Sequence, residues 1–156
     1  MIKKIISGGQ TGVDQGALEA ALKMHVERGG FCPEGRICED GIIPVKYELT
    51  ELSSSDYAER TEKNVLESDG TLILCTDFDL EGGTLLTKCL AEKHGKPVMI
   101  AKVDQCLNRK IYSWIRNNCI SVLNVAGPRE SKCPGIFKLT EQYVLQLLSK
   151  NPDASR

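Results

Sequence analysis

The chain has 156 residues, of which 41% are hydrophobic and 26% charged, and its formal net charge is −1. This length and composition are typical of one globular domain and exclude a disordered chain. A net charge so close to zero offers no basic surface for duplex nucleic acid or an anionic membrane, so we expect neither as a partner. Any anion that binds must therefore be held locally, by backbone amides and a few arginines.

The seven cysteines are scattered, and no two have the CxxC spacing of a zinc or redox motif. Free thiols are typical of a reducing compartment, which favours the cytoplasm, and no metal site is expected. Three of them, Cys75, Cys89 and Cys119, lie in apolar patterns and are expected in the core. The apolar run at the N-terminus is too short for a signal peptide, and no run approaches the ~20 residues of a membrane span.

Hydrophobic patterning along the chain predicts strands that alternate with helices. The expected elements are a strand at 2–6, a helix at 13–24, a long loop at 29–47 with a short strand near Phe31, a helix at 56–67, a strand at 71–75, a helix at 84–94, a strand at 97–101, a helix at 107–119, a strand at 120–125 and a closing helix at 136–148. We predict one domain over residues 1–150 and a frayed tail at 151–156. The fold class is α/β, a Rossmann-like three-layer α/β/α sandwich with a mostly parallel sheet.

In such sheets ligands bind beyond the carboxyl ends of the strands, so ligand-binding residues are expected in the segments that follow the strands. Residues 7–14 read Ser-Gly-Gly-Gln-Thr-Gly-Val-Asp. Their glycines and the N-terminus of the following helix are typical of an anion site, although the spacing is neither GxGxxG nor a Walker A motif. A tight turn would need only two glycines, so we favour binding. Asp14 either offsets the helix dipole or orients a ligand group.

Two more segments repeat the pattern. Residues 82–87 place a glycine pair and two threonines at the start of a helix, and residues 124–131 place an arginine in a Gly-Pro turn after a strand. An arginine there either clamps a phosphate or lies free in solvent. The helix at 56–67 adds a polar stripe that is either a binding face or a solvated one. The candidate ligand-binding residues are Ser7, Gly8, Gly9, Gln10, Thr11, Gly12, Asp14, Arg36, Arg60, Asn64, Gly82, Gly83, Thr84, Thr87, Asn124, Gly127, Arg129 and Ser131.

Further segments complete an ordered set of motifs along the chain. The set comprises residues 7–14, Gly-Phe-Cys-Pro-Glu-Gly-Arg at 30–36, Glu-Asp-Gly-Ile-Ile-Pro at 39–44, residues 57–65, Ser-Asp-Gly-Thr-Leu-Ile at 68–73, Gly-Gly-Thr at 82–84 and Leu-Asn-Val-Ala-Gly-Pro-Arg-Glu-Ser at 123–131. As a set, these motifs resemble the molybdenum carrier family. That family is described as a circularly permuted branch of the Rossmann-like superfamily that includes DprA and the cytokinin-activating phosphoribohydrolases. The resemblance implies a carrier of molybdenum cofactor (molybdopterin) or a binder of a nucleotide derivative. By analogy it also implies a homo-oligomer.

The sequence departs from the hydrolase relatives at one position. Their signature resembles Pro-Gly-Gly-x-Gly-Thr-x-x-Glu, and Thr87 stands here in place of the catalytic glutamate. We therefore favour a binding or carrier protein for a phosphorylated nucleotide-like ligand, without an assigned catalytic residue. The alternative is a phosphoribohydrolase-like hydrolase of nucleoside monophosphate derivatives, in which Glu81 would have to substitute. A third reading is a scaffold in a larger assembly. We expect Gly9→Val or Gly12→Val to abolish binding with little loss of fold, because the new side chain would occupy the anion's space.

Overall fold

The computed structural model describes residues 1–107 and 109–150, so the expected tail lies outside the described residues. Its centre is a five-stranded sheet in the order β2-β1-β9-β7-β8, and every neighbouring pair is parallel. The strands of this sheet are β1 (Lys4–Ile6), β2 (Glu27–Gly29), β7 (Gly70–Cys75), β8 (Val98–Lys102) and β9 (Val122–Ala126). The helices are α1 (Val13–Lys23), α2 (Tyr57–Leu66), α3 (Gly82–Lys93), α4 (Arg109–Asn117) and α5 (Ile136–Ser149). The predicted Rossmann-like α/β/α architecture is confirmed.

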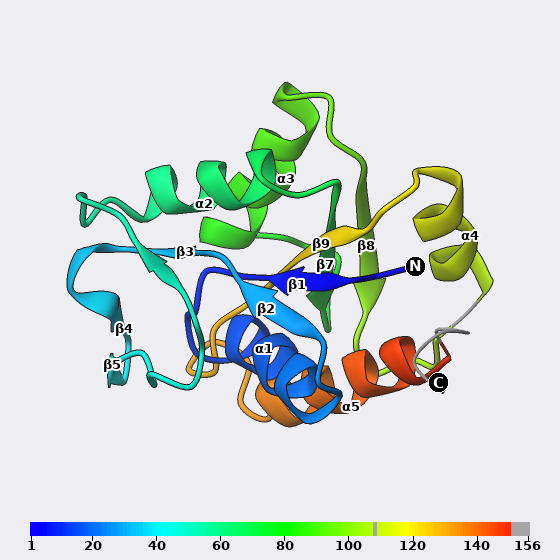
Figure 1. Ribbon diagram of the computed structural model, residues 1–156, viewed down its shortest axis with the longest axis horizontal. Helices are drawn as coiled ribbons and strands as arrows, with labels where there is room; N and C mark the ends of the chain where they lie inside the picture. Colours follow the sequence, from blue (N-terminus) through cyan, green and yellow to red (C-terminus); the bar gives the residue numbers. More distant parts are fainter. Residues whose placement is uncertain (108, 151–156) are drawn as a thin grey trace.

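The helices cover both faces of the sheet, with α1 and α5 on one side and α2 and α3 on the other (Figure 1). Strand β7 is buried along its whole length, as its unbroken apolar run predicts for a central parallel strand. The main core joins this strand to α1, α4 and α5. A side chain at Gly16 of α1 would lie 2.7 Å from the Phe137 carbonyl oxygen, so glycine lets α1 and α5 pack closely.

The segment expected as a long loop holds more structure than its composition indicates. It contains β3 (Phe31–Cys32), η1 (Glu34–Arg36), β4 (Ile37–Cys38), β5 (Gly41–Ile42) and β6 (Thr50–Glu51). Strands β3 and β6 pair in parallel, and β4 and β5 form an antiparallel hairpin. The edge strand β2 was missed because Glu-Arg-Gly has no apolar pattern. The two short pairs stand beside the main sheet (Figure 1).

Other predictions need smaller corrections. Helix α3 begins at Gly82 rather than Thr84, and β9 spans Val122–Ala126 rather than 120–125. Cys75 is buried as expected, but Cys89 and Cys119 are exposed. An apolar neighbourhood in sequence did not determine which face of its element each thiol occupies.

The connections leave the sheet in two directions from its middle. The chain passes from β1 through α1 to the outer strand β2, and from β7 through α3 to the opposite outer strand β8. Because α1 and α3 cover opposite faces, the carboxyl ends of β1, β9 and β7 lie between two diverging helices. Such a reversal is where parallel α/β sheets open a crevice.

Candidate functional site

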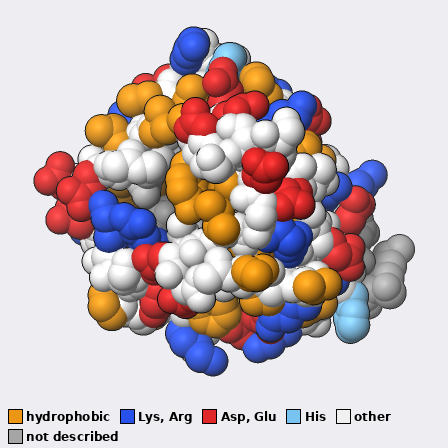
Figure 2. Space-filling view, turned by 90° about the vertical axis from the view of Figure 1, so that its left-hand side faces the viewer, with side chains coloured by type: hydrophobic (Ala, Val, Ile, Leu, Met, Phe, Trp, Pro, Cys, Tyr) orange, Lys and Arg blue, Asp and Glu red, His pale blue; other side chains and the backbone are white. Residues whose placement is uncertain are grey.

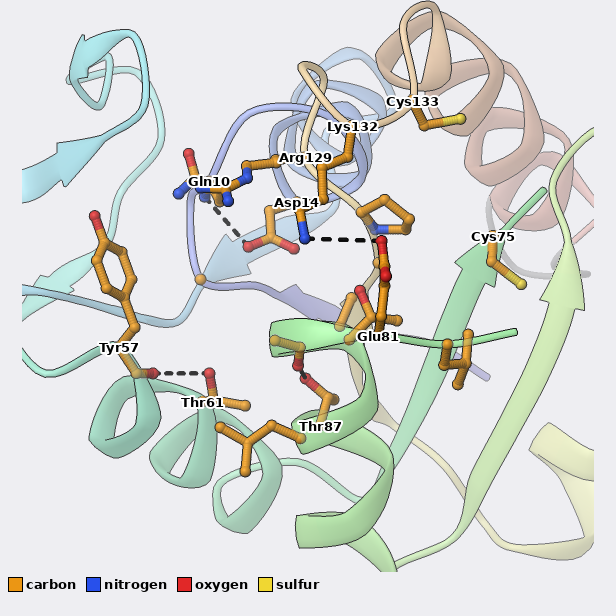
Figure 3. A pocket seen from close by; sticks show the side chains of 18 of the residues that line it. Gln10, Asp14, Tyr57, Thr61, Cys75, Glu81, Thr87, Arg129, Lys132 and Cys133 are labelled. Carbon is orange, nitrogen blue, oxygen red and sulfur yellow. Dashed lines mark hydrogen bonds and ion pairs between the residues drawn. The ribbon is translucent and has the colours of Figure 1, made fainter. Parts of the chain in front are cut away.

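A cavity of about 490 Å³ lies at this reversal, beyond the carboxyl ends of β1, β7 and β9. Its walls come from the first glycine loop, α2, the start of α3 and the loop after β9 (Figure 3). This volume suits a mononucleotide-sized molecule. The predicted residues that line it are Gly8, Gln10, Asp14, Arg60, Asn64, Gly83, Thr84, Thr87, Asn124, Gly127 and Arg129.

The remaining predicted residues do not line the cavity, and most of them have structural partners. They are Ser7, Gly9, Thr11, Gly12, Arg36, Gly82 and Ser131. The Ser7 hydroxyl donates to the Val125 carbonyl at 2.9 Å, which ties β1 to β9. The Arg36 guanidinium donates to carbonyl oxygens of Pro44 at 3.0 Å and Tyr47 at 2.9 Å, which stabilises the turn in that segment.

Several backbone amides of the first glycine loop donate hydrogen bonds within the loop or to the loop after β9. The amide of Gln10 donates to Asp14 Oδ2 at 3.2 Å, that of Thr11 to Gln10 Oε1 at 3.1 Å, and that of Val13 to the Pro128 carbonyl at 3.2 Å. Three of the donors expected to cradle an anion are therefore already satisfied. This loop is less available for phosphate than its sequence indicates.

The expected tolerance of Gly9→Val and Gly12→Val is also wrong. A Cβ at Gly9 would come within 2.8 Å of the Leu49 and Ile43 side chains. One at Gly12, where φ is 79°, would lie 2.5 Å from the Pro128 carbonyl oxygen. Both positions face neighbouring protein and not the cavity, so a side chain there would disturb packing before it reached a ligand.

Gly8 has a different role, because it makes room for an arginine. A Cβ at Gly8 would lie 1.5 Å from Nη1 of Arg60, and the same Nη1 is 3.1 Å from Asp14 Oδ2. Burial raises the pKa of the Asp14 carboxyl, and Arg60 opposes that shift. The Arg60 side chain is only 12% exposed, and its buried Nε has no partner among the described residues. The cavity wall thus holds a largely buried guanidinium that is paired with Asp14 and whose Nε is enclosed by protein.

The start of α3 is the least satisfied part of the wall. Its N-cap residue Glu81 makes no capping hydrogen bond with its side chain. Within the described chain, no hydrogen bond engages the amides of Gly82, Gly83 and Thr84. A Cβ at Gly83 would meet nothing within 4 Å, so this backbone is open to the cavity. Thr84 is 8% exposed, and its hydroxyl also lacks a partner in the part of the chain that is described.

Two basic side chains from the loop after β9 line the same cavity, Lys132 directed toward Glu81 at the start of α3 and Arg129 directed toward Gln10 (Figure 3). The Lys132 Nζ lies 3.9 Å from Glu81 Oε1, across the entrance from the start of α3. Arg129 Nε is 3.6 Å from Glu39 Oε2. Lys132 was missed by the sequence argument, although its place three residues after Arg129 in one short loop was an available signal.

The pattern that defines the family described as "Circularly permutated YpsA SLOG family" matches residues 5–148. This chain belongs to that family. A solved structure named "Putative molybdenum carrier protein", from Syntrophus aciditrophicus SB, is 45% identical, covers 94% of each chain and superposes with a TM-score of 0.86. Among curated proteins, none matches the chain.

In this SLOG-family member, other predicted side chains line the cavity but are engaged with protein atoms. The Asn64 amide both accepts from the Phe31 amide at 2.8 Å and donates to the Phe31 carbonyl at 3.0 Å. The Thr87 hydroxyl donates to the Gly83 carbonyl at 2.8 Å. Asn124 Nδ2 donates to Thr71, which leaves its oxygen as an acceptor beside the cavity. These residues shape the wall more than they offer free donors.

The linker between β7 and α3 contributes lining residues that sequence reasoning left out, because it showed only a short connection there. The additional lining residues are Tyr57, Thr61, Cys75, Thr76, Asp77, Asp79, Leu80, Glu81, Leu86, Ala126, Pro128, Lys132 and Cys133.

In the described ranges no three His, Cys, Asp or Glu side chains are grouped as a metal site would require.

On the face seen in Figure 2, acidic and basic side chains are interspersed, so neither sign forms a continuous patch there. No helix in residues 1–107 or 109–150 combines the length and apolar character needed to cross a membrane.

Proposed function

We propose that this protein binds and carries a small phosphorylated heterocyclic ligand, with molybdenum cofactor as the leading candidate. The observation that carries this proposal is the uncapped start of α3, which opens beside Lys132 into a cavity that Arg129 also lines. Three free backbone amides and the positive end of the helix dipole favour a dianionic group at this place. Lys132 and Arg129 add charge that the phosphate itself would attract.

The rest of the cavity can hold a polar ring. The guanidinium of Arg60, the oxygen of Asn124 and the hydroxyl of Thr84 offer both donors and acceptors along the wall. A pterin or a purine carries complementary groups on its edge. The residues present therefore fit a ligand with a phosphate at one end and a heterocycle at the other. The name of the structure that is 45% identical supports molybdenum cofactor over other members of this class.

The direct test is calorimetry with AMP, adenosine and isolated molybdenum cofactor. We expect saturable binding of AMP or the cofactor, and weaker binding of adenosine because it lacks the phosphate. Lys132→Gln should weaken binding of the phosphorylated ligand about tenfold or more, as expected for loss of one charge-assisted contact. Saturable binding of neither phosphorylated molecule would overturn the proposal.

Hydrolysis remains the alternative function, but no feature of the site favours it. Thr87 occupies the place of the relatives' glutamate and bonds to the backbone, and the Glu81 side chain is 81% exposed and faces Lys132. Chromatography of a nucleoside monophosphate panel would detect released base or ribose phosphate. Turnover that Glu81→Gln abolishes would replace the carrier proposal with a hydrolase.

We also propose that the protein acts in the cytoplasm and associates with copies of itself. Free cysteines support the first proposal, and analogy supports the second. Sedimentation velocity of the purified protein tests the second proposal, and a monomer at all concentrations would contradict it.

A further inference from the structure

Glu39 lies at the turn of the β4–β5 hairpin, yet its side chain is only 17% exposed. The carboxylate reaches two segments that are distant in sequence. It accepts hydrogen bonds from the Thr11 hydroxyl and from the Ser131 amide at 3.0 Å. Its other oxygen accepts from the Ser131 hydroxyl and lies 3.6 Å from Arg129 Nε. A single carboxylate therefore connects the hairpin to the first glycine loop and to the loop after β9.

The backbone of the hairpin makes a further contact to the same rim. The Glu39 amide donates to Gln10 Oε1 at 2.9 Å, and this oxygen also accepts from the Thr11 amide. Gln10 and Arg129 both line the cavity, whereas no residue of the hairpin does. The hairpin therefore contacts the cavity only indirectly, through its bonds to Gln10 and Arg129.

The contact with Arg129 leaves its ligand-binding end free. The ion pair joins Glu39 Oε2 to Arg129 Nε at 3.6 Å, and in the described residues no hydrogen bond occupies the terminal nitrogens of Arg129. Hydrogen bonds from Ser131 and Thr11, together with the charge of Arg129, hold the pKa of Glu39 below its usual value, so the carboxylate is charged at neutral pH. An arginine that is 45% exposed would otherwise sample many rotamers.

We propose that Glu39 is a positioning residue for ligand binding, which holds Arg129 at the rim of the cavity with its terminal nitrogens directed to an anion. This inference rests on the proposed function, because it assigns a role in binding to a residue outside the cavity. By fixing Arg129 before the ligand arrives, Glu39 reduces the conformational entropy that binding must remove. The hairpin is accordingly part of the site, although it contributes no wall.

The test is a double-mutant cycle read by calorimetry with AMP and with isolated molybdenum cofactor. Glu39→Gln should weaken binding about three- to tenfold, which corresponds to ordering one rotamer-rich side chain. In an Arg129→Gln background the same change should have little further effect, because Glu39 acts through Arg129. Ile42→Thr is the control. It alters an exposed position of the same hairpin and should leave affinity unchanged.

A ligand-free measurement keeps the two proposals separable. In NMR relaxation measurements on arginine-labelled protein, the Arg129 Nε–H group should be ordered in the wild type and in Ile42→Thr, and should become more mobile in Glu39→Gln. An unchanged Arg129 signal, wild-type or tighter affinity in Glu39→Gln, or losses that multiply in the double variant would overturn this inference alone. Absence of binding by the wild-type protein would overturn the proposed function and this inference with it.

Discussion

At the scale of single residues, the glycines of the site have separate roles that their common sequence pattern conceals. Gly8 accommodates Arg60, Gly12 packs against the loop after β9, and Gly83 faces open space. The glycine-rich pattern predicted that these loops border a site, which the cavity supports. It could not predict which glycines face the cavity, because that depends on what lies beyond each Cα in three dimensions.

Gly12→Ala should destabilise the fold. Its φ of 79° disfavours a side chain, and the new Cβ would lie 2.5–2.8 Å from backbone atoms of residues 128–130. We expect the free energy of unfolding to fall by about 1–3 kcal/mol or more, measured by urea denaturation. Gly83→Ala is the matched change without such contacts and should leave that free energy nearly unchanged. Equal stability of both variants would contradict the packing role of Gly12.

The same isosteric substitution at two threonines separates binding from stability. The Thr84 hydroxyl borders the cavity, so Thr84→Val should weaken ligand binding about two- to tenfold without a change in thermal stability. Thr140 Oγ1 in α5 is fully buried without a partner in the described chain, so Thr140→Val should leave stability unchanged or raise it by about 1 kcal/mol, with unaltered affinity. Calorimetry and thermal denaturation of both variants check this. Weaker binding in Thr140→Val with unchanged binding in Thr84→Val would mean that the cavity is misassigned.

At the scale of elements, the long apolar and amphipathic segments were predictable, whereas the segment between α1 and α2 was not. Strand β7 and helix α5 follow from strong local patterns. Strands β2 to β6 have two or three residues each, too few for periodicity to show, and are held by tertiary bonds such as those of Asn64 to Phe31. The contribution of Glu39 was missed for the same reason, since the three hydrogen bonds and the ion pair of its carboxylate come from distant loops.

The hairpin contact also predicts a pH dependence. The pKa of Glu39 is lowered in the folded state, so its stabilising effect is complete above its unfolded pKa of about 4.3 and is lost as the pH falls through the lower folded pKa. In urea denaturation, the stability difference between wild type and Glu39→Gln should be constant from pH 7 to about pH 5 and should shrink below pH 4. Other carboxyl groups titrate in both proteins and cancel in the difference. A difference that does not change down to pH 3 would contradict this role of Glu39.

At the scale of the whole molecule, the reversal between β1 and β7 positions the site. The alternation of strands and helices predicted a parallel sheet, but it could not give the order β2-β1-β9-β7-β8, because strand order depends on which side each crossover takes. That order brings the last loop, with Arg129 and Lys132, between the two glycine loops. We therefore propose the phosphate site at the start of α3 rather than at the first glycine loop, where the sequence alone placed it.

The most direct test of the central claim is an NMR titration of the protein with AMP and with isolated molybdenum cofactor, followed through the backbone amides. We predict the largest shifts at Gly82, Gly83 and Thr84, whose amides are free, and smaller shifts at Gln10, Thr11 and Val13, whose amides are already bonded. Adenosine should leave the first group nearly unshifted. Saturable binding of a phosphorylated ligand that leaves Gly82, Gly83 and Thr84 unshifted would contradict the assignment of the anion site to α3.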